Sequence, residues 1–131
     1  MRKSAELLLA EANERRVALK TRVADLVAVT AFHSDSMTVD VKPLVKREVA
    51  GAYVSPPPIL AVKVARIPLK VTVGGESAVV RPDINPGDIG VVVYLDLDSD
   101  QSIMTGAESQ PNSCRIHSGD DAIFIGVITP G

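Results

Sequence analysis

The segment Asp88–Asp98 has the sequence DIGVVVYLDLD, which is the strongest strand signal in the chain. β-Branched residues dominate its first half, and this favours an extended strand over a helix. The preceding NPGD places Pro86 and Gly87 at the two central positions of a type II turn. Gly90 lies inside the strand, where a glycine indicates a bulge or the close approach of another backbone. The segment therefore predicts a turn that leads into a core strand.

Three aspartates alternate at the end of this strand, as they do at the start of a calcium-binding loop: Asp96, Asp98 and Asp100. An EF-hand loop also needs glycine at position 6 and a bidentate glutamate at position 12. Counted from Asp96, those positions hold Gln101 and Ala107. The segment before the aspartates is also a strand, whereas an EF-hand requires a helix there. We therefore expect a solvated, acidic strand end and no metal site.

Extended segments and turns fill most of the remaining chain. HSDS at 33–36 and Gly74-Gly75 each predict a hairpin turn. The prolines Pro56–Pro58 interrupt regular structure and indicate an edge or crossing segment, and residues 99–114 predict a long polar loop. Besides 88–98, the expected strands cover residues 26–32, 37–41, 59–65, 67–73, 77–81 and 121–128.

The N-terminal segment has the pattern of a helix. Ser4 is a suitable N-cap, and Glu6 suits the first turn, where its charge is stabilised by the helix dipole. No long helix separates the later strands, which argues against a parallel α/β sheet. The expected fold class is mainly β, with an N-terminal α-helix followed by a small OB-type Greek-key β-barrel. The expected organisation is an N-terminal docking or oligomerisation helix at 1–24 and the barrel domain at 25–131.

Composition excludes several classes of protein. The single cysteine, Cys114, rules out an internal disulfide and a cysteine-based zinc site. No apolar run approaches the roughly twenty residues that span a membrane. Glu6 and Glu11 interrupt the apolar N-terminal stretch, which is therefore not a secretory signal. Aromatic residues make up 3% of the chain, so the core must consist mainly of Val, Ile, Leu and Ala.

Charge is distributed unevenly along the chain. Residues 1–75 hold 12 Lys/Arg and 7 Asp/Glu, whereas residues 76–131 hold 2 and 9, which gives net charges of +5 and −7. The simpler interpretation is that the two sets of charges lie on different faces of the surface and keep the protein soluble, because charged side chains are mostly at the surface. The alternative is that the two ends meet different partners, or meet each other in a neighbouring subunit.

Candidate catalytic groups are few. Cys114 and His117 are three residues apart, so a small hydrolase built on a Cys–His pair is one hypothesis. His33, Asp120 and Asp121 are the other candidates for acid or base chemistry. No oxyanion, phosphate-loop or dinucleotide motif accompanies them. We therefore expect no enzyme activity, no catalytic residue, no cofactor and no metal.

Two stretches carry a family resemblance: RPDINPGDIGVVVYLDLD at 81–98 and CRIHSGDDAIFIGVI at 114–128. Together with VAVTAFHSDSMTVDVKPL at 27–44, the chain resembles the N-terminal OB domain of the central spike of contractile phage tails. The resemblance covers about residues 20–131. The residues that carry the signature are Pro86, Gly87, Asp88, Gly90, Arg115, His117 and Asp121.

The resemblance implies a structural virion protein at the tip of the tail baseplate. It implies an OB barrel that forms a homotrimer around the tail axis, docks on the tail hub or tube proteins, and transmits force for penetration of the host envelope. Related spikes usually continue into a β-helix and a histidine-bound iron tip, but this sequence stops at VITPG and has no His-x-His pair. A separate or missing C-terminal tip, and only indirect membrane contact, are therefore expected. A bacterial contractile weapon would use the same part, so the resemblance does not separate it from a phage tail.

Two further expectations concern sites. Arg115, His117 and Asp121 should form a local polar network that pins the long loop to the last strand. The alternative function is an OB-fold binding module for nucleic acid or a protein partner. Single-stranded nucleic acid needs a basic groove with aromatic platforms. The four aromatic residues are scattered and the C-terminal half is acidic, so we expect no nucleic-acid partner.

Overall fold

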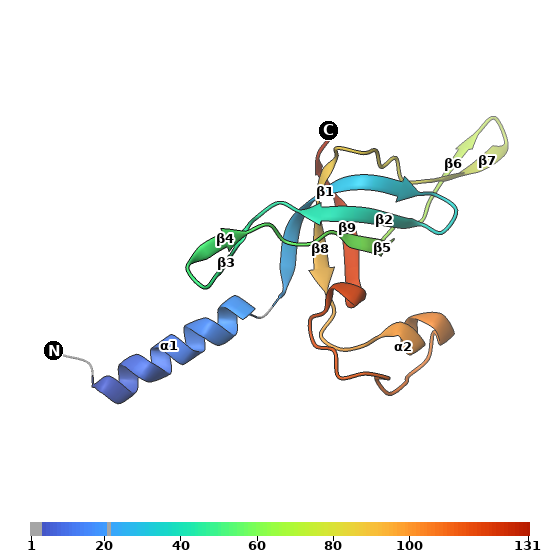
Figure 1. The fold of residues 1–131 in the computed structure, drawn as a ribbon. Helices are drawn as coiled ribbons and strands as arrows, with labels where there is room; N and C mark the ends of the chain where they lie inside the picture. The colour runs from blue at the N-terminus through green and yellow to red at the C-terminus, as the bar shows by residue number, and fades with distance from the viewer. Residues whose placement is uncertain (1–3, 21) are drawn as a thin grey trace.

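In the computed structural model, which describes residues 4–20 and 22–131, five strands close into a barrel (Figure 1). The barrel strands are β1 (Ala24–His33), β2 (Thr38–Pro43), β5 (Ile59–Val64), β8 (Ile89–Tyr94) and β9 (Ala122–Thr129). The other elements are α1 (Ala5–Lys20), β3 (Arg47–Val49), β4 (Ala52–Val54), β6 (Leu69–Val73), β7 (Glu76–Val80), α2 (Asp100–Thr105) and the 3-10 turn η1 (Gly119–Asp121).

The order of strands around the barrel is β1-β2-β5-β9-β8, and β8 pairs with β1 to close it. All neighbours are antiparallel except β5 and β9, which pair in parallel at Lys63↔Ile123 and Val64↔Phe124. The predicted β hairpins at 33–36 and Gly74-Gly75 are confirmed, because β1 pairs with β2 and β6 with β7. The mainly β class with an N-terminal helix is thereby confirmed.

The core lies inside the barrel and is small and rich in valine. Its buried apolar residues are Val27, Val29, Val39, Val41, Val62, Ile84, Val92, Tyr94, Ala122 and Phe124. Gly90 of β8 faces β9 so closely that a Cβ atom would overlap the Gly126 carbonyl oxygen and the Phe124 ring. The predicted close approach of another backbone at Gly90 is therefore confirmed.

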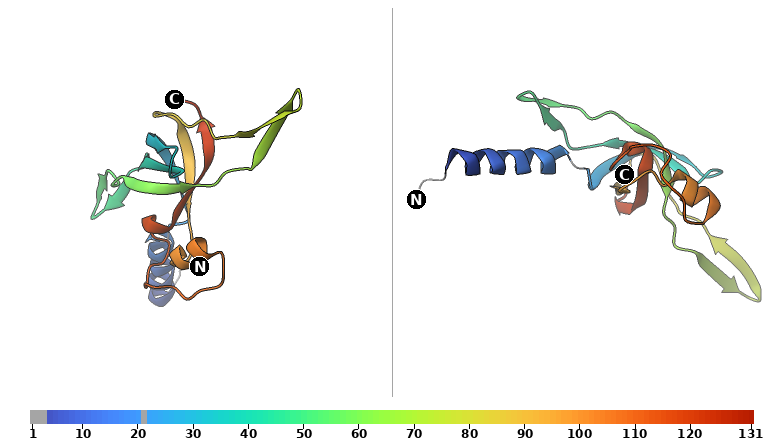
Figure 2. Two further views of the ribbon diagram at one scale, coloured as in Figure 1. Left: turned by 90° about the vertical axis from the view of Figure 1, so that its right-hand side faces the viewer. Right: turned by 90° about the horizontal axis from the view of Figure 1, so that it is seen from below.

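Three elements extend away from the barrel: α1, the β3–β4 hairpin and the β6–β7 hairpin (Figures 1 and 2). Every residue of β4, β6 and β7 is exposed. The described side chains of α1 are exposed as well, including Leu8 and Val17. No described helix is long and apolar enough to cross a membrane.

The helical expectations are confirmed in part. The Ser4 hydroxyl accepts a hydrogen bond from the Leu7 backbone N–H at 3.1 Å, as an N-cap does. Residues 1–3 and 21 of the expected helical range 1–24 lie outside the described residues. The prediction of an unbroken polar loop at 99–114 is wrong, because α2 forms inside it and ends at Gly106, which adopts the left-handed conformation. A helix of six residues carries too weak a periodic signal to be seen in sequence.

Candidate functional site

A four-residue ionic cluster joins the α2 loop to the start of β9. The Arg115 guanidinium donates from Nε and Nη2 to Asp121, at 3.0 and 2.9 Å. The same Nη2 lies 2.7 Å from Asp98 and 3.1 Å from Asp100. Because Asp121 directly precedes β9 and Asp98 follows β8, one cation ties the loop to two barrel strands.

Two of the four side chains in this cluster are almost completely buried. The side chains of Asp98 and Asp121 are only 3% and 1% exposed. The Arg115 hydrogen bonds hold the pKa of the Asp121 carboxyl below its ordinary value, and a hydrogen bond from Ser113 does the same for the pKa of Asp98. The pKa of Arg115 is raised, chiefly by its hydrogen bonds to Asp121. The expectation of a solvated acidic strand end is therefore wrong for Asp98, which is buried and paired.

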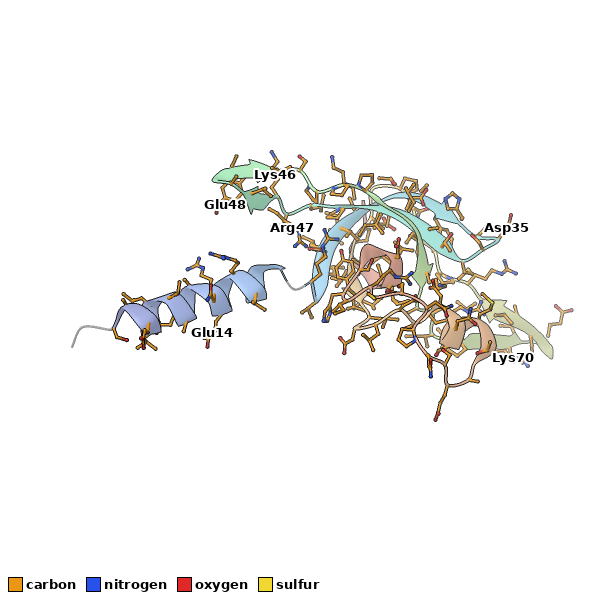
Figure 3. All side chains as sticks on the ribbon, turned by 60° about the horizontal axis from the view of Figure 1, so that its bottom comes forward. Glu14, Asp35, Lys46, Arg47, Glu48 and Lys70 are labelled. Atoms are coloured by element: carbon orange, nitrogen blue, oxygen red, sulfur yellow. The ribbon has the colours of Figure 1, made fainter. Side chains whose placement is uncertain are left out.

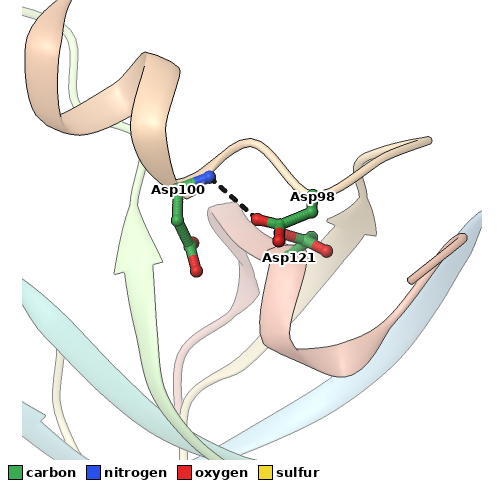
Figure 4. A group of neighbouring side chains, drawn as sticks. All are labelled: Asp98, Asp100 and Asp121. Carbon is green, nitrogen blue, oxygen red and sulfur yellow. Dashed lines mark hydrogen bonds between the residues drawn. The ribbon is translucent and has the colours of Figure 1, made fainter. Parts of the chain in front are cut away.

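The three carboxylates offer oxygens within 4.8 Å of one another, an arrangement that could hold a metal ion (Figure 4). Asp100 also donates its backbone N–H to Asp98 at 3.2 Å. The Arg115 guanidinium already bonds to all three carboxylates, and Lys63 Nζ lies 4.0 Å from Asp100, so the chain itself supplies positive charge beside the cluster. We therefore interpret the cluster as a structural clamp on the loop.

His117 occupies a different place from the one predicted. Its ring Nε2 lies 3.6 Å from an Asp96 carboxylate oxygen, and its backbone N–H donates to the Asp96 carbonyl oxygen at 3.2 Å. Its backbone has a φ of 47°, which is uncommon for a residue with a side chain. The predicted network is thus confirmed for Arg115 with Asp121 but wrong for His117, which pairs with Asp96 instead.

The remaining chemical candidates do not converge. Cys114 is exposed, and no hydrogen bond joins its thiol to His117 among the residues that the structure describes. His33 lies at the far end of β1, where its Nε2 is 3.0 Å from Asp40. Asp120 is exposed beside the clamp. Within residues 4–20 and 22–131, these candidates do not bring a nucleophile, a base and an oxyanion site together around one point.

The turn signature at 86–88 fixes the start of β8. Gly87 has a φ of 93°, the left-handed region that glycine tolerates, and its N–H donates to the Val29 carbonyl at 2.8 Å. The buried Asp88 carboxylate accepts hydrogen bonds from the backbone N–H groups of Gly131 at 2.8 Å and Asn85 at 2.9 Å. These two bonds lower the pKa of Asp88. The signature residues Pro86, Gly87, Asp88 and Gly90 thus lie together at one end of the barrel, whereas Arg115, His117 and Asp121 lie beyond the opposite end of β8.

A basic hollow of about 990 Å³ lies between α1 and the β3–β4 hairpin (Figure 3). Its lining residues are Ala12, Arg15, Arg16, Arg22, Lys46, Arg47, Glu48, Val49, Ala50 and Tyr53. Five cations and one anion give it a net charge of +4. The sequence shows that the first half of the chain is positively charged. It does not show that these residues meet in one hollow, because they come from three separate segments.

The side of the hollow next to the barrel is built from partly buried polar contacts. Arg47 bonds to the Asp25 carboxylate at 3.1 Å, and the Tyr94 hydroxyl donates to the same carboxylate at 2.5 Å. Burial, followed by the bond to Asp25, raises the pKa of Tyr94. The Arg22 guanidinium stacks over the Tyr94 ring at 5.6 Å. These contacts hold two of the five cations at fixed positions.

Comparison of the chain with known protein families and with characterised proteins finds no match. Its function is therefore inferred from the geometry described above and from the resemblance of its sequence motifs.

Proposed function

We propose that this protein is a structural subunit of a contractile tail: a homotrimeric OB-type spike or hub adaptor at the baseplate tip. The observation that carries the proposal is the strand order. Counted along the chain, the barrel strands run 1-2-3-5-4, with strand 1 closing on strand 4 and a parallel pair between strands 3 and 5. A closed five-stranded Greek-key barrel of this order is typical of the OB fold.

The exposed area supports assembly with other copies. The chain exposes 9642 Å² of surface, whereas a compact monomer of its 13.8 kDa mass exposes about 6,600 Å². The excess of about 3,000 Å² falls in the range that permanent interfaces bury. The three elements that extend from the barrel supply it, since they contact little of their own chain.

The β6–β7 hairpin shows what kind of surface this is. Cross-strand pairing places five apolar residues on one face of the ribbon together with Glu76: Leu69, Val71, Val73, Ala78 and Val80. All five are exposed, and an isolated two-stranded hairpin is marginally stable in water. A second or third copy packed on this face would cover it.

In this proposal the function is mechanical. Three barrels form a rigid plug that transmits the thrust of sheath contraction to the host envelope. The α1 helices pack on the tail hub or tube proteins, which would bury their exposed leucines. A tip, supplied by another protein or another segment, makes the contact with the membrane, and no catalysis is involved.

Light scattering of the purified chain over a wide concentration range tests the proposal. A mass near three times 13.8 kDa supports the spike. A protein that stays monomeric alone and also in the presence of its hub protein contradicts it.

The basic hollow favours a second candidate, an OB-type binding module for nucleic acid. It combines five cations with one aromatic side chain, Tyr53, on which a base could stack. Salt-dependent retention on heparin and on single-stranded DNA would support this module. Absence of retention at low salt would leave the spike as the better hypothesis.

A further inference from the structure

We propose that the basic hollow is one half of the contact between subunits, and that it receives the acidic α2 loop of a neighbouring copy. This inference rests on the proposed trimer and specifies which surfaces meet in it. The acidic α2 loop is defined here as residues 95–121, which contain six Asp/Glu and one Arg. Its net charge of −5 matches the +4 of the hollow.

The exposed members of the two surfaces carry the argument. Asp96 and Glu108 are exposed on the acidic side, and Asp96 has 87% of its side chain accessible. Arg15 and Arg16 are exposed on α1, facing the hollow. The aspartates of the clamp already bond to Arg115, so the exposed carboxylates Asp96, Glu108 and Asp120 are what a partner would meet.

Both surfaces also have an apolar part. The acidic α2 loop exposes Leu97, Ile103, Met104 and Ile116, and Met104 is 77% accessible. The hollow contributes Ala12, Val49, Ala50 and Tyr53. Apolar patches rimmed by opposite charges are the arrangement found at specific protein interfaces. A small anionic ligand would need the cations of the hollow but not the apolar residues on both sides.

The two surfaces adjoin at the barrel, where a Cβ atom on Gly119 would lie 3.9 Å from the Arg22 guanidinium, but the helices α1 and α2 that carry their outer parts lie apart. Figure 1 and the right panel of Figure 2 show α1 and α2 well separated along the length of the molecule, although both lie below the barrel in Figure 1. The patches are not self-complementary, because each surface carries mainly one sign of charge. A head-to-tail contact of the hollow with the loop of the next copy closes into a ring such as the proposed trimer, whereas two reciprocal contacts would give a two-fold dimer, and the mass in solution distinguishes them.

Charge reversal tests this contact. The variant R15E/R16E makes the hollow acidic, and D96K/E108K makes the loop basic. Each should raise the concentration needed for trimer formation by about tenfold or more, because like charges then face each other across the interface. The fourfold variant that carries both pairs should return to within about threefold of the original protein, since the attraction is restored with its signs exchanged.

A matched control separates a specific contact from an effect of net charge. D35K/D83K makes the same change of net charge as D96K/E108K at two exposed positions outside both surfaces. Its assembly should match that of the original protein. Circular dichroism of every variant checks that the barrel remains folded, which we expect because all six positions are exposed.

The possible outcomes distinguish this inference from the proposed function. An original protein that stays monomeric alone and also in the presence of its hub protein would overturn both. A trimer whose stability does not change with salt, and is the same in R15E/R16E and D96K/E108K as in the original protein, would overturn only the inference about its surfaces. Salt-dependent binding of single-stranded DNA that R15E/R16E abolishes, with assembly unchanged, would assign the hollow to nucleic acid and overturn the inference. Weakened assembly in both variants and recovery in the fourfold variant would establish it.

Discussion

The barrel has a small core, so single residues have a large effect on its packing and stability. Ten buried apolar residues hold the barrel together, and Phe124 is the largest of those that are fully buried. Gly90 leaves the space that the Phe124 ring fills. The absence of a side chain at Gly90 therefore determines how closely β8 and β9 approach each other.

Gly90→Ala should destabilise the protein by about 3 kcal/mol or more, because a methyl group would displace both the Phe124 ring and a strand backbone. The free energy of unfolding in urea measures the effect. Gly119→Ala is the matched control, since the atom nearest to the added methyl group would be Ile59 Cγ2 at 3.8 Å and the φ of Gly119 lies outside the left-handed region. Equal stabilities of the two variants would contradict the account of Gly90.

At the scale of elements, hydrogen-bonded carboxylates hold the loops to the barrel. Asp88 joins the turn before β8 to the chain after β9, and Asp121 joins the α2 loop to the start of β9. In each case a hydrogen-bonded carboxylate, and not buried apolar side chains, holds the loop in place. The stability of these loops should therefore depend on charge more than the stability of the core does.

Removal of the cation from the clamp has a specific expected result. Arg115→Met leaves Asp98, Asp100 and Asp121 with oxygens within 4.8 Å of one another and without the guanidinium that bonds to all three, while Lys63 Nζ is 4.0 Å from Asp100 alone. Mutual repulsion should lower the thermal midpoint by several degrees at pH 7. Millimolar calcium should recover part of that loss, because three convergent carboxylates then have a cation to bind. The original protein should show no calcium effect, and a variant indifferent to calcium would contradict the predicted geometry.

Stability should also fall at acid pH. The pKa values of Asp40, Asp88, Asp98 and Asp121 are lowered by hydrogen bonding in the folded state. Their stabilisation is therefore complete above the ordinary value of 3.8 and is lost as the pH falls through the lower, folded-state values. Urea midpoints from pH 7 to pH 2 should show this decline.

Asp88→Asn identifies the contribution of one of these groups. It should be less stable at pH 7, because the amide cannot accept as well from the Gly131 and Asn85 N–H groups. It should also lose less stability below pH 4, since the position no longer titrates. Parallel curves for the two proteins would show that Asp88 does not contribute in this way.

At the scale of the whole molecule, the chain combines a closed barrel with three extensions that it does not cover. The barrel alone satisfies its own strands, because closure leaves no strand edge unpaired. The extensions expose apolar side chains that water solvates poorly. An assembly would stabilise them without changing the barrel.

The β6–β7 ribbon provides the test at this scale. V71S/V73S alters its apolar face, and K70S/T72S is the control on the opposite face. The first should raise the concentration needed for trimer formation by about tenfold or more, because two valines per copy lose their burial. The second should leave assembly nearly unchanged. Equal effects in light scattering would show that the apolar face is not covered by another copy.

The sequence by itself determined the order and type of most elements. Alternating β-branched residues, the glycine turns and the Ser4 cap act locally, so hairpins such as β1–β2 and β6–β7 follow from neighbouring residues. The resemblance pointed to Arg115 and Asp121, and these residues do bond to each other. The short helix α2 was missed because six residues give too little periodicity.

Only the tertiary structure decided which distant residues meet. The parallel β5–β9 pair, the His117–Asp96 contact and the burial of Asp98 depend on barrel closure. The basic hollow collects cations from α1, from the segment before β1 and from the β3–β4 hairpin. Local sequence fixes backbone conformation over a few residues, whereas such sites require contacts between segments far apart in the chain. Their geometry is set by the packing of the whole barrel.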